Sequence, residues 1–258
     1  FDLNEAERVG SSANVHIVAQ MDRFQGGYAG DGDWVSARRY YVTQDDDLQR
    51  VNSDLIEDLG EVNMADGQTL VDFATWAIQT YPADKVALIL SDHGMGWPGG
   101  WSDPTSRSTD RSLPLASLVG DQLFLHELDQ ALADIRSQTG LDKFELIGMD
   151  ACLMSHLEVL SDLANHARFA IASQETEPAL GWAYASFLAE LTANPAMNGA
   201  DLGQAIVNTY IQDDQRIVDD QERANLVGRG SVLNSLFGVP SVPSAAQVSN
   251  QIYQNVTL

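Results

Sequence analysis

Strand-length runs of apolar residues without polar alternation constrain the fold of this chain more than any other feature. The clearest is Lys85–Ser91, which reads KVALILS, and Phe144–Met149 and Arg168–Ser173 are similar. A strand that is apolar on both faces is typical of a parallel sheet covered by helices on each side. Parallel neighbours require long crossover connections, and enough residues for a helix separate each run from the next. The three runs therefore predict an α/β protein.

Amphipathic helical patterns fill the segments between the predicted strands. Asp66 is the expected N-cap of a helix that Pro82 ends. Leu125 to Ile135 forms a second pattern, which Gly140 stops. Further strands are expected in Asn14–Met21 and Trp34–Gln44, and further helices in Leu153–Leu160, Tyr184–Leu191, Leu202–Tyr210 and Ala245–Val256. This order predicts βαβ units and a three-layer α/β/α sandwich with a mostly parallel central sheet, in a single domain over residues 1–258.

Residues 98–121 form the longest irregular connection in the middle of the chain. The segment is rich in Gly, Pro, Ser and Asp and has no apolar period. Connections of this kind are usually lids, binding loops or cleavage sites. Beyond Arg216 the helical signal weakens, and Gly228–Pro243 reads as a loop.

The charge of the chain limits its partners. The formal net charge is −23 at pH 7, from 14 basic and 37 acidic residues. This excess argues against nucleic acid and anionic membranes, and no apolar run approaches the roughly 18 residues of a membrane span. It fits a cationic substrate, and it equally fits a protein kept soluble by repulsion or adapted to salt. The single cysteine excludes an internal disulfide and a zinc site built from several cysteines.

The one cysteine lies where two of these patterns meet. Asp150-Ala151-Cys152 separates an apolar run from leucines at helical spacing, which places the thiol at the carboxyl edge of the sheet and at the amino end of a helix. Unpaired N–H groups at a helix start favour a thiolate over a thiol. His93 follows the neighbouring run, so the same edge receives an imidazole. A cysteine peptidase uses such a pair to attack a carbonyl and to protonate the leaving amine.

Gly94, directly after the histidine, adds to this hypothesis. Because it has no side chain, its N–H can approach a substrate closely and donate to the oxyanion formed during attack, with the N–H of Cys152 as a second donor. Other interpretations stay open. A cysteine after a buried strand is often a small core residue. His156, four residues after the cysteine, is an alternative base or a partner in a metal pair unless it packs in the core.

The remaining candidate residues have structural explanations. His16, His126 and His166 read as structural histidines, and Ser91, Asp92 and Ser155 do not form a credible serine triad. Asp31-Gly32-Asp33 is suggestive of calcium binding, but two acids fall short of a dedicated loop, so a solvated turn is the alternative. No glycine-rich phosphate loop follows a strand, which argues against a nucleotide-binding domain.

Several longer stretches resemble one known family. GMDACLM around Cys152, LILSDHGMGW around His93 and the upstream DLGEVNMADGQTLVDFATWAIQTYPADKVALIL are similar to the clostripain-like cysteine peptidases, relatives of caspases, gingipains, legumain and separase. IASQETEPALGWAY downstream is similar as well. The resemblance runs from about Val51 to Phe187, and its His-Gly and Asp-Ala-Cys pieces are specific when they occur together in this order. Chains of this family generally continue further, so the resemblance implies a caspase-like peptidase domain truncated at its C-terminal end.

The resemblance implies a catalytic dyad of His93 and Cys152, with the amides of Gly94 and Cys152 as oxyanion donors. It also implies an endopeptidase whose protein or peptide substrates are cut after Arg or Lys, with Arg preferred. The sequence leaves the oligomeric state open.

A specificity pocket is implied by the acid two positions before the cysteine. Asp150 matches the residue that lies in the primary specificity pocket of the family, and a carboxylate there would bind a guanidinium through two hydrogen bonds. The alternative is that Asp150 caps the helix after Cys152. Glu175 and Glu177, in the loop after the next strand, are weaker candidates for a second pocket acid.

Family habits suggest further properties. Members are often activated by cutting themselves between the His and Cys strands, and Arg107 and Arg111 lie in the irregular loop there. Clostripain depends on calcium while other members do not, so the resemblance requires no cofactor and permits calcium. It implies a secreted or cell-envelope protein. The alternative function is a catalytically silent domain of the same fold that serves as a binding or scaffolding module, and the intact catalytic set argues against it.

Overall fold

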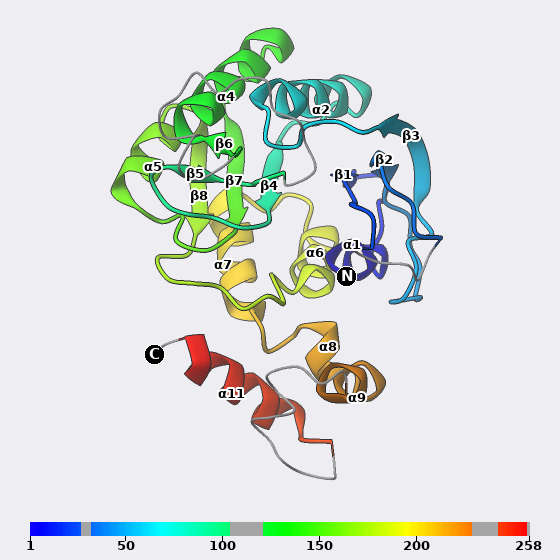
Figure 1. Cartoon of the computed structure of the whole chain (residues 1–258). Coiled ribbons are helices and arrows are strands. Elements are labelled where there is room, and N and C mark those ends of the chain that lie inside the picture. Colours follow the sequence, from blue (N-terminus) through cyan, green and yellow to red (C-terminus); the bar gives the residue numbers. More distant parts are fainter. Residues whose placement is uncertain (27–31, 104–120, 229–241, 257–258) are drawn as a thin grey trace.

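Figure 1 shows the computed structural model of the chain, which describes residues 1–26, 32–103, 121–228 and 242–256. The helices are α1 (Asp2–Glu7), α2 (Gly67–Thr80), α4 (Leu125–Thr139), α5 (Leu157–Leu163), α6 (Tyr184–Ala193), α7 (Gly199–Thr209), α8 (Gln215–Val218), α9 (Asp220–Gly228) and α11 (Ala245–Val256). The strands are β1 (Val18–Met21), β2 (Ala37–Tyr41), β3 (Asp54–Gly60), β4 (Ala87–Ser91), β5 (Gly99–Gly100), β6 (Leu123–Phe124), β7 (Phe144–Asp150) and β8 (Ala167–Ala172).

A three-stranded parallel sheet in the order β4-β7-β8 forms the centre of the fold. β7 lies in the middle and is buried along nearly its whole length, as its apolar sequence predicts. β4 pairs with it from Ala87 opposite Leu146 to Ser91 opposite Asp150. Because the two strands end level with each other, the residues that follow them leave the sheet at the same edge.

Helices cover both faces of this sheet, which confirms the predicted three-layer α/β/α architecture. On one face α2, α4 and α5 build a core that includes Leu132 and Val159. On the other face α6 and α7 pack with Leu146 of β7 in a second core, around Phe187 and Ile206. In Figure 1, α2 and α4 lie above the central strands, α5 lies to their left, and α6 and α7 lie below.

The N-terminal strands form a separate antiparallel sheet in the order β1-β2-β3. The parallel pairing expected of the central sheet therefore holds for β4, β7 and β8 but not for these strands. β3 goes unpredicted because its sequence, DLIEDLG, carries acids that are depleted in strands. Its acids pair across the sheet with β2: Arg38 contacts Asp58 at 2.8 Å, and Arg39 contacts Glu57 at 3.2 Å. Cross-strand pairs of opposite charge stabilise such a strand.

Two fully buried glutamates tie α1 into the fold. Glu5 accepts hydrogen bonds from the backbone N–H groups of Tyr184, at 2.8 Å, and Gln215, at 2.6 Å. Glu7 accepts from both the backbone N–H and the hydroxyl of Ser53, each at 2.6 Å. The first helix is thereby joined to α6, to α8 and to the segment before β3. Burial raises the pKa of Glu5 to about 8.

Local signals predict some elements well and others poorly. The side chain of Asp66 caps α2 by accepting from the N–H of Gln68 at 2.8 Å, and α4 ends at Gly140, as predicted. β8 is less buried than its apolar run indicates, since Phe169 is 39% exposed. The reason is that, among the described strands, β8 pairs with β7 only, at the end of the sheet.

None of the helices in the described parts of the chain has the length and apolar content that crossing a bilayer requires.

Candidate active site

His93 and Cys152 leave the parallel sheet at matching positions. Ser91 of β4 pairs with Asp150 of β7, and the histidine and the cysteine each lie two residues further along. The N–H of Asp92 donates to the carbonyl of Asp150 at 3.3 Å, which continues the pairing past the strand ends. His93 is exposed and Cys152 is half-buried. The structure therefore brings the predicted imidazole and thiol to one edge of the sheet, and it leaves both within reach of solvent.

Two glycines let the loops after β4 and β7 pack against each other. A methyl group on Gly94 would collide with the carbonyl oxygen of Cys152. Gly96 has a φ of 76°, and a methyl group there would lie 2.5 Å from Nδ1 of His156. Positive φ disfavours other residues at Gly96, and the close approach disfavours them at both positions. His156 therefore packs on the backbone of the loop that carries the candidate histidine.

The helix predicted to begin at Cys152 begins later. Leu153 has a left-handed φ of 64°. The N–H groups of Leu153 and Ser155 donate to carbonyls of the loop after β8, at 3.0 and 2.8 Å. These hydrogen bonds hold the segment as a turn against that loop, and α5 starts only at Leu157. The prediction of a helix start at the thiol is wrong.

A backbone donor takes the place of the helix terminus. The N–H of Glu177 donates to Sγ of Cys152 at 3.2 Å, and the sulfur lies 3.8 Å from the carbonyl oxygen of the same residue. The loop after β8 therefore supplies both of these backbone contacts to the sulfur.

Asp150 bonds to the start of α6. Its side chain is 4% exposed and accepts hydrogen bonds from the N–H of Trp182, at 3.2 Å, and from the hydroxyl of Tyr184, at 3.0 Å. Burial raises the pKa of Asp150, and the hydrogen bonds that it accepts act in the opposite direction. Because α5 begins at Leu157 and has His156 as its N-cap, the alternative role of Asp150 as a helix cap is wrong.

Glu177 and Asp150 form a carboxyl pair. Burial raises the pKa of Glu177 to about 8, and both repulsion from Asp150 and a hydrogen bond between the two side chains add to the shift. Two carboxyl groups in such contact hold one proton between them, since the second ionisation is opposed by the first. The side chain of Glu175 is exposed, and its backbone carbonyl contacts the loop that follows Cys152. Of the two candidates for a second acid, the structure brings Glu177 to Asp150.

Sequence reasoning missed two residues beside this pair. The Tyr184 hydroxyl contacts Asp150, and its only sequence signal is its place in the GWAY stretch that follows the acidic loop. Arg216 is held by Asp214 at 2.7 Å, by Asp2 at 3.5 Å and by the carbonyl of Leu180, and its positive charge lowers the pKa of Asp150. No local pattern marks Arg216, because two of its partners, Asp2 and Leu180, come from distant segments.

The other predicted residues are elsewhere. Arg107, Arg111 and Asp31 lie outside the described residues. His16 contacts the hydroxyl of Tyr41 at 3.0 Å, and the buried His166 contacts Asp129 at 2.7 Å. His126 is exposed on α4.

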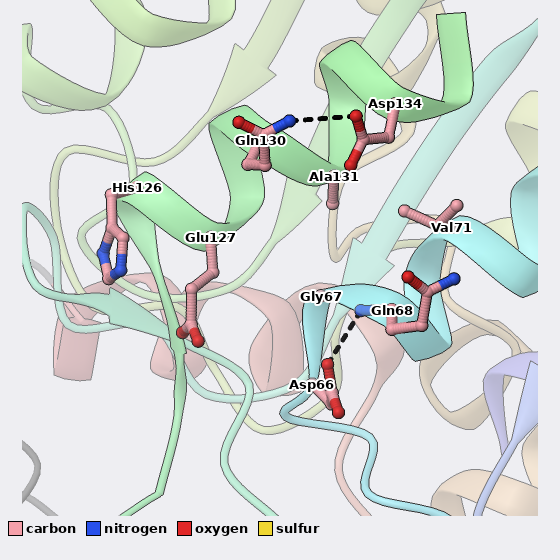
Figure 2. Close-up of a pocket in the computed structure, with 9 residues that line it drawn as sticks. All are labelled: Asp66, Gly67, Gln68, Val71, His126, Glu127, Gln130, Ala131 and Asp134. Carbon is pink, nitrogen blue, oxygen red and sulfur yellow. Dashed lines mark hydrogen bonds between the residues drawn. The ribbon is translucent and has the colours of Figure 1, made fainter. Parts of the chain in front are cut away.

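A pocket of about 420 Å³ lies between α2 and α4 (Figure 2). Its lining includes the carboxylates of Asp66, Glu127 and Asp134 and the imidazole of His126. Each of these carboxylates already accepts a hydrogen bond, either from a residue of its own helix or, for Glu127, from the N–H of Phe124 just before α4. No residue of the lining comes from the loops after β4 and β7, so the pocket is not part of the candidate active site.

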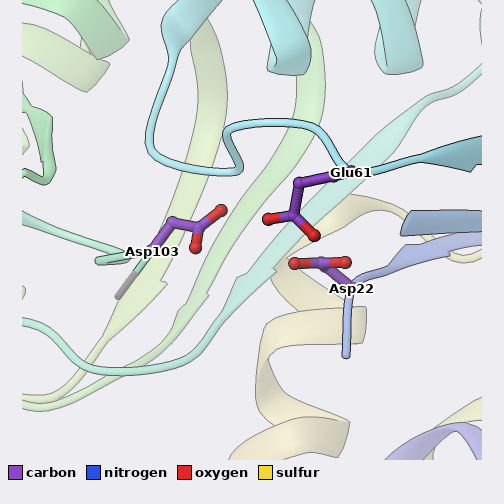
Figure 3. Close-up of side chains that lie close together, drawn as sticks. All are labelled: Asp22, Glu61 and Asp103. Carbon is purple, nitrogen blue, oxygen red and sulfur yellow. The ribbon is translucent and has the colours of Figure 1, made fainter. Parts of the chain in front are cut away.

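An acidic cluster of Asp22, Glu61 and Asp103 lies where the segments after β1, β3 and β5 meet (Figure 3). One carboxylate oxygen from each residue lies within 4.8 Å of the others. Burial raises the pKa of Asp22 to about 6, and repulsion from the other two acids adds to it. The cluster does not include Asp33 of the sequence motif singled out for calcium. Calcium binding by this chain stays a prediction.

Comparison of sequences places the chain in a family. The sequence profile of the clostripain family, peptidase C11, matches residues 1–224. The chain belongs to the clostripain family. The matched range includes the loops after β4 and β7 and the Asp150–Glu177 pair, whereas α11 lies beyond it. No curated protein matches the sequence significantly.

Solved structures of the clostripain family share the fold. A secreted C11 cysteine protease from Bacteroides thetaiotaomicron, in complex with an irreversible peptide inhibitor, has 23% identity and a TM-score of 0.59, over 84% of this chain and 54% of that one. The Bacteroides thetaiotaomicron secreted C11 cysteine protease called iotapain has 17% identity and a TM-score of 0.55, over 80% and 55%. An inactive zymogen C11 protease from Parabacteroides distasonis has 18% identity and a TM-score of 0.56, over 93% and 63%. At these identities the likeness shows the caspase-like fold alone, and the chain spans a little over half the length of the first two structures.

The carboxyl pair makes stability depend on pH. The pKa of Glu177 is about 8 in the folded chain against an ordinary value of 4.5, so the folded state binds more protons than the unfolded state between these values. Its contribution to the free energy of unfolding is therefore full below about pH 4.5 and is lost as the pH rises toward 8. We expect Glu177→Gln to raise the free energy of unfolding at pH 8.5 by about 1 kcal/mol or more relative to wild type, and by much less at pH 5. Urea titrations at the two pH values measure this.

The exposed neighbour provides the matched control. Glu175→Gln removes one charge from the same loop without touching Asp150. It is expected to change stability equally little at both pH values. A gain in the Glu177→Gln protein that is the same at pH 5 and pH 8.5 contradicts the shared-proton description.

Proposed function

We propose that the chain is the catalytic part of a cysteine endopeptidase that cleaves after Arg and, less readily, Lys. The observation that carries the proposal is the level ending of β4 and β7, which delivers His93 and Cys152 to one edge of the sheet. The contact of Gly94 with the carbonyl of Cys152 supports the same geometry. Membership of the clostripain family agrees with it.

The chemistry follows from these groups. The Sγ of Cys152, as thiolate, attacks the scissile carbonyl carbon, and the imidazole of His93 carries a proton to the amine that leaves when the C–N bond breaks. Water then hydrolyses the thioester and restores the thiol. On one side of Gly94, the N–H of Met95 donates to the carbonyl of Gly99, and on the other side the carbonyl of His93 accepts from the N–H of Trp101. The N–H of Gly94 itself has no backbone acceptor among the described residues. We assign that N–H, with the N–H of Cys152, to the oxyanion.

The acid pair explains a preference for Arg. Both residues are close to the cysteine along the chain or in space: Asp150 is two residues before Cys152, and the backbone N–H of Glu177 donates to Sγ. A substrate guanidinium would replace the shared proton as the positive partner of the two carboxylates, and its fork-shaped donors match a carboxylate through two hydrogen bonds. A lysine ammonium offers a single charge without that geometry. The net charge of −23 also attracts cationic segments of a protein substrate.

Secretion is part of the proposal. Two of the structural relatives are described as secreted C11 cysteine proteases. A peptidase with this preference would act on proteins or peptides outside the cell or in its envelope.

The dyad is tested by turnover of a fluorogenic Arg-amide. We expect Cys152→Ala and His93→Ala to lower kcat by about 10³-fold or more, because each removes a group that takes part in bond making or proton transfer. His126→Ala, an exposed histidine on α4, is the control and should keep the wild-type rate. Wild-type turnover that survives a thiol alkylator speaks against a cysteine nucleophile, and an absence of turnover throughout speaks for the silent binding module.

The proposed specificity pocket at Asp150 is tested by the selectivity for Arg over Leu before the cut. Asp150→Asn keeps an oxygen for Trp182 and Tyr184 but removes the charge. We expect kcat/KM for an Arg-amide to fall about 100-fold while that for the matching Leu-amide changes little, since a buried charge pair is lost only with Arg. Reaction of Cys152 with iodoacetamide reports an intact nucleophile. If the Arg-to-Leu ratio stays at its wild-type value, the pocket assignment is wrong.

Self-processing is the second part of the proposal. Arg107 and Arg111 lie between the candidate catalytic segments and have the residue type that the pocket would accept. Purified wild-type chain is expected to be cut after one of them, and Cys152→Ala chain to stay whole over the same period. Intact-mass spectrometry detects the cut. A Cys152→Ala protein that is cut equally fast contradicts self-processing.

A further inference from the structure

The loop that carries His93 is a short hairpin. Gly94 bridges Gly100 in antiparallel fashion, flanked by hydrogen bonds from the N–H of Trp101 to the carbonyl of His93, at 2.7 Å, and from the N–H of Met95 to the carbonyl of Gly99, at 2.9 Å. The turn is closed by the N–H of Gly99, which donates to the carbonyl of Gly96 at 3.0 Å. Trp97 and Pro98 occupy the tip.

Side chains of this hairpin alternate in exposure. Gly94 and Gly96 are buried against the cysteine loop, whereas His93, Met95 and Trp97 are exposed. In extended backbone, alternate residues share a face, so Met95 lies on the same face as the imidazole. Met95 is 44% exposed and Trp97 is 57% exposed. Met95 therefore lies beside the candidate catalytic histidine, and Trp97 is exposed at the tip of the same hairpin.

The hairpin holds these side chains in place. Pro98 fixes the backbone next to the tryptophan, and its carbonyl accepts from the N–H of Leu125 at 3.2 Å. β5, just after the turn, pairs with β6. The amide of Gln122 donates to the sulfur of Met95 at 3.2 Å. A rigid apolar surface loses little entropy when a ligand covers it.

The direction of the reaction decides what this surface faces. The imidazole of His93 protonates the leaving amine, so the part of the substrate after the cut lies on the histidine side. The acid pair, which in the proposed function receives the residue before the cut, belongs to the cysteine side, because the backbone N–H of Glu177 donates to Sγ of Cys152. We infer that Met95 and Trp97 form a subsite for a bulky apolar side chain in the first two positions after the scissile bond. This inference rests on the proposed function, and it extends the specificity from one side of the cut to both.

The subsite is tested with two internally quenched peptides that share their sequence up to a single Arg. One continues with Phe-Leu and the other with Ser-Ser, and the readout is the ratio of their kcat/KM values. Covering part of an indole and a thioether with an apolar side chain favours the Phe-Leu peptide by about tenfold. In Trp97→Ser we expect this ratio to fall to about threefold or less, and in Met95→Ser/Trp97→Ser to about one. Hydrolysis of the Ser-Ser peptide by each variant reports that the dyad is assembled.

The matched control is Val207→Ser on α7, which replaces a side chain that is 60% exposed on a different helix. It should keep the wild-type ratio. A wild-type ratio near one, or an unchanged ratio in Trp97→Ser, overturns the subsite while leaving the Arg-directed peptidase standing. If wild type cleaves neither peptide nor an Arg-amide, the proposed function fails and the subsite fails with it.

Discussion

The parallel pairing of β4 with β7 is the constraint on which the rest of the site depends. A shift of one residue between these strands would turn the side chains of one strand to the opposite face and would separate the two loops that follow. The register is fixed from both ends: the apolar side chains of β7 fill two different cores, and the loops beyond the strands interlock through Gly94 and Gly96. The chemistry at the edge is therefore a consequence of packing in the layers beneath it.

Around Asp150 the chain accepts an electrostatic cost. Burial raises the pKa values of Asp2, Glu5, Asp150 and Glu177, and Arg216 is the cation held among them by Asp2 and Asp214. Hydrogen bonds from Trp182, Tyr184 and Gln215 offset part of this cost. Groups that destabilise a fold are retained where they help to bind a ligand, which is why carboxyl groups with raised pKa values gather at functional sites.

Sequence patterns predicted the parts of this structure that local physics decides. The apolar runs of β4 and β7, the cap at Asp66 and the end of α4 at Gly140 all depend on neighbouring residues. The arrival of a histidine and a cysteine at one edge was predictable because apolar runs of this kind pair in parallel, so that their carboxyl ends meet. The start of α5 was mispredicted because Leu153 and Ser155 give their N–H groups to a loop that comes later in the chain. The same applies to the choice between Glu175 and Glu177 and to Arg216, whose surroundings are assembled from segments with no common pattern.

The two buried glutamates of α1 have a consequence for the order of folding. Glu5 accepts from the amides of Tyr184 and Gln215, which lie 179 and 210 positions away, whereas Glu7 accepts from Ser53, 46 positions away. Contacts between such distant residues form late, because closing a long loop costs more entropy than closing a short one. Tyr184 also donates to Asp150, so we expect the surroundings of this carboxyl group to be completed only when α1 docks.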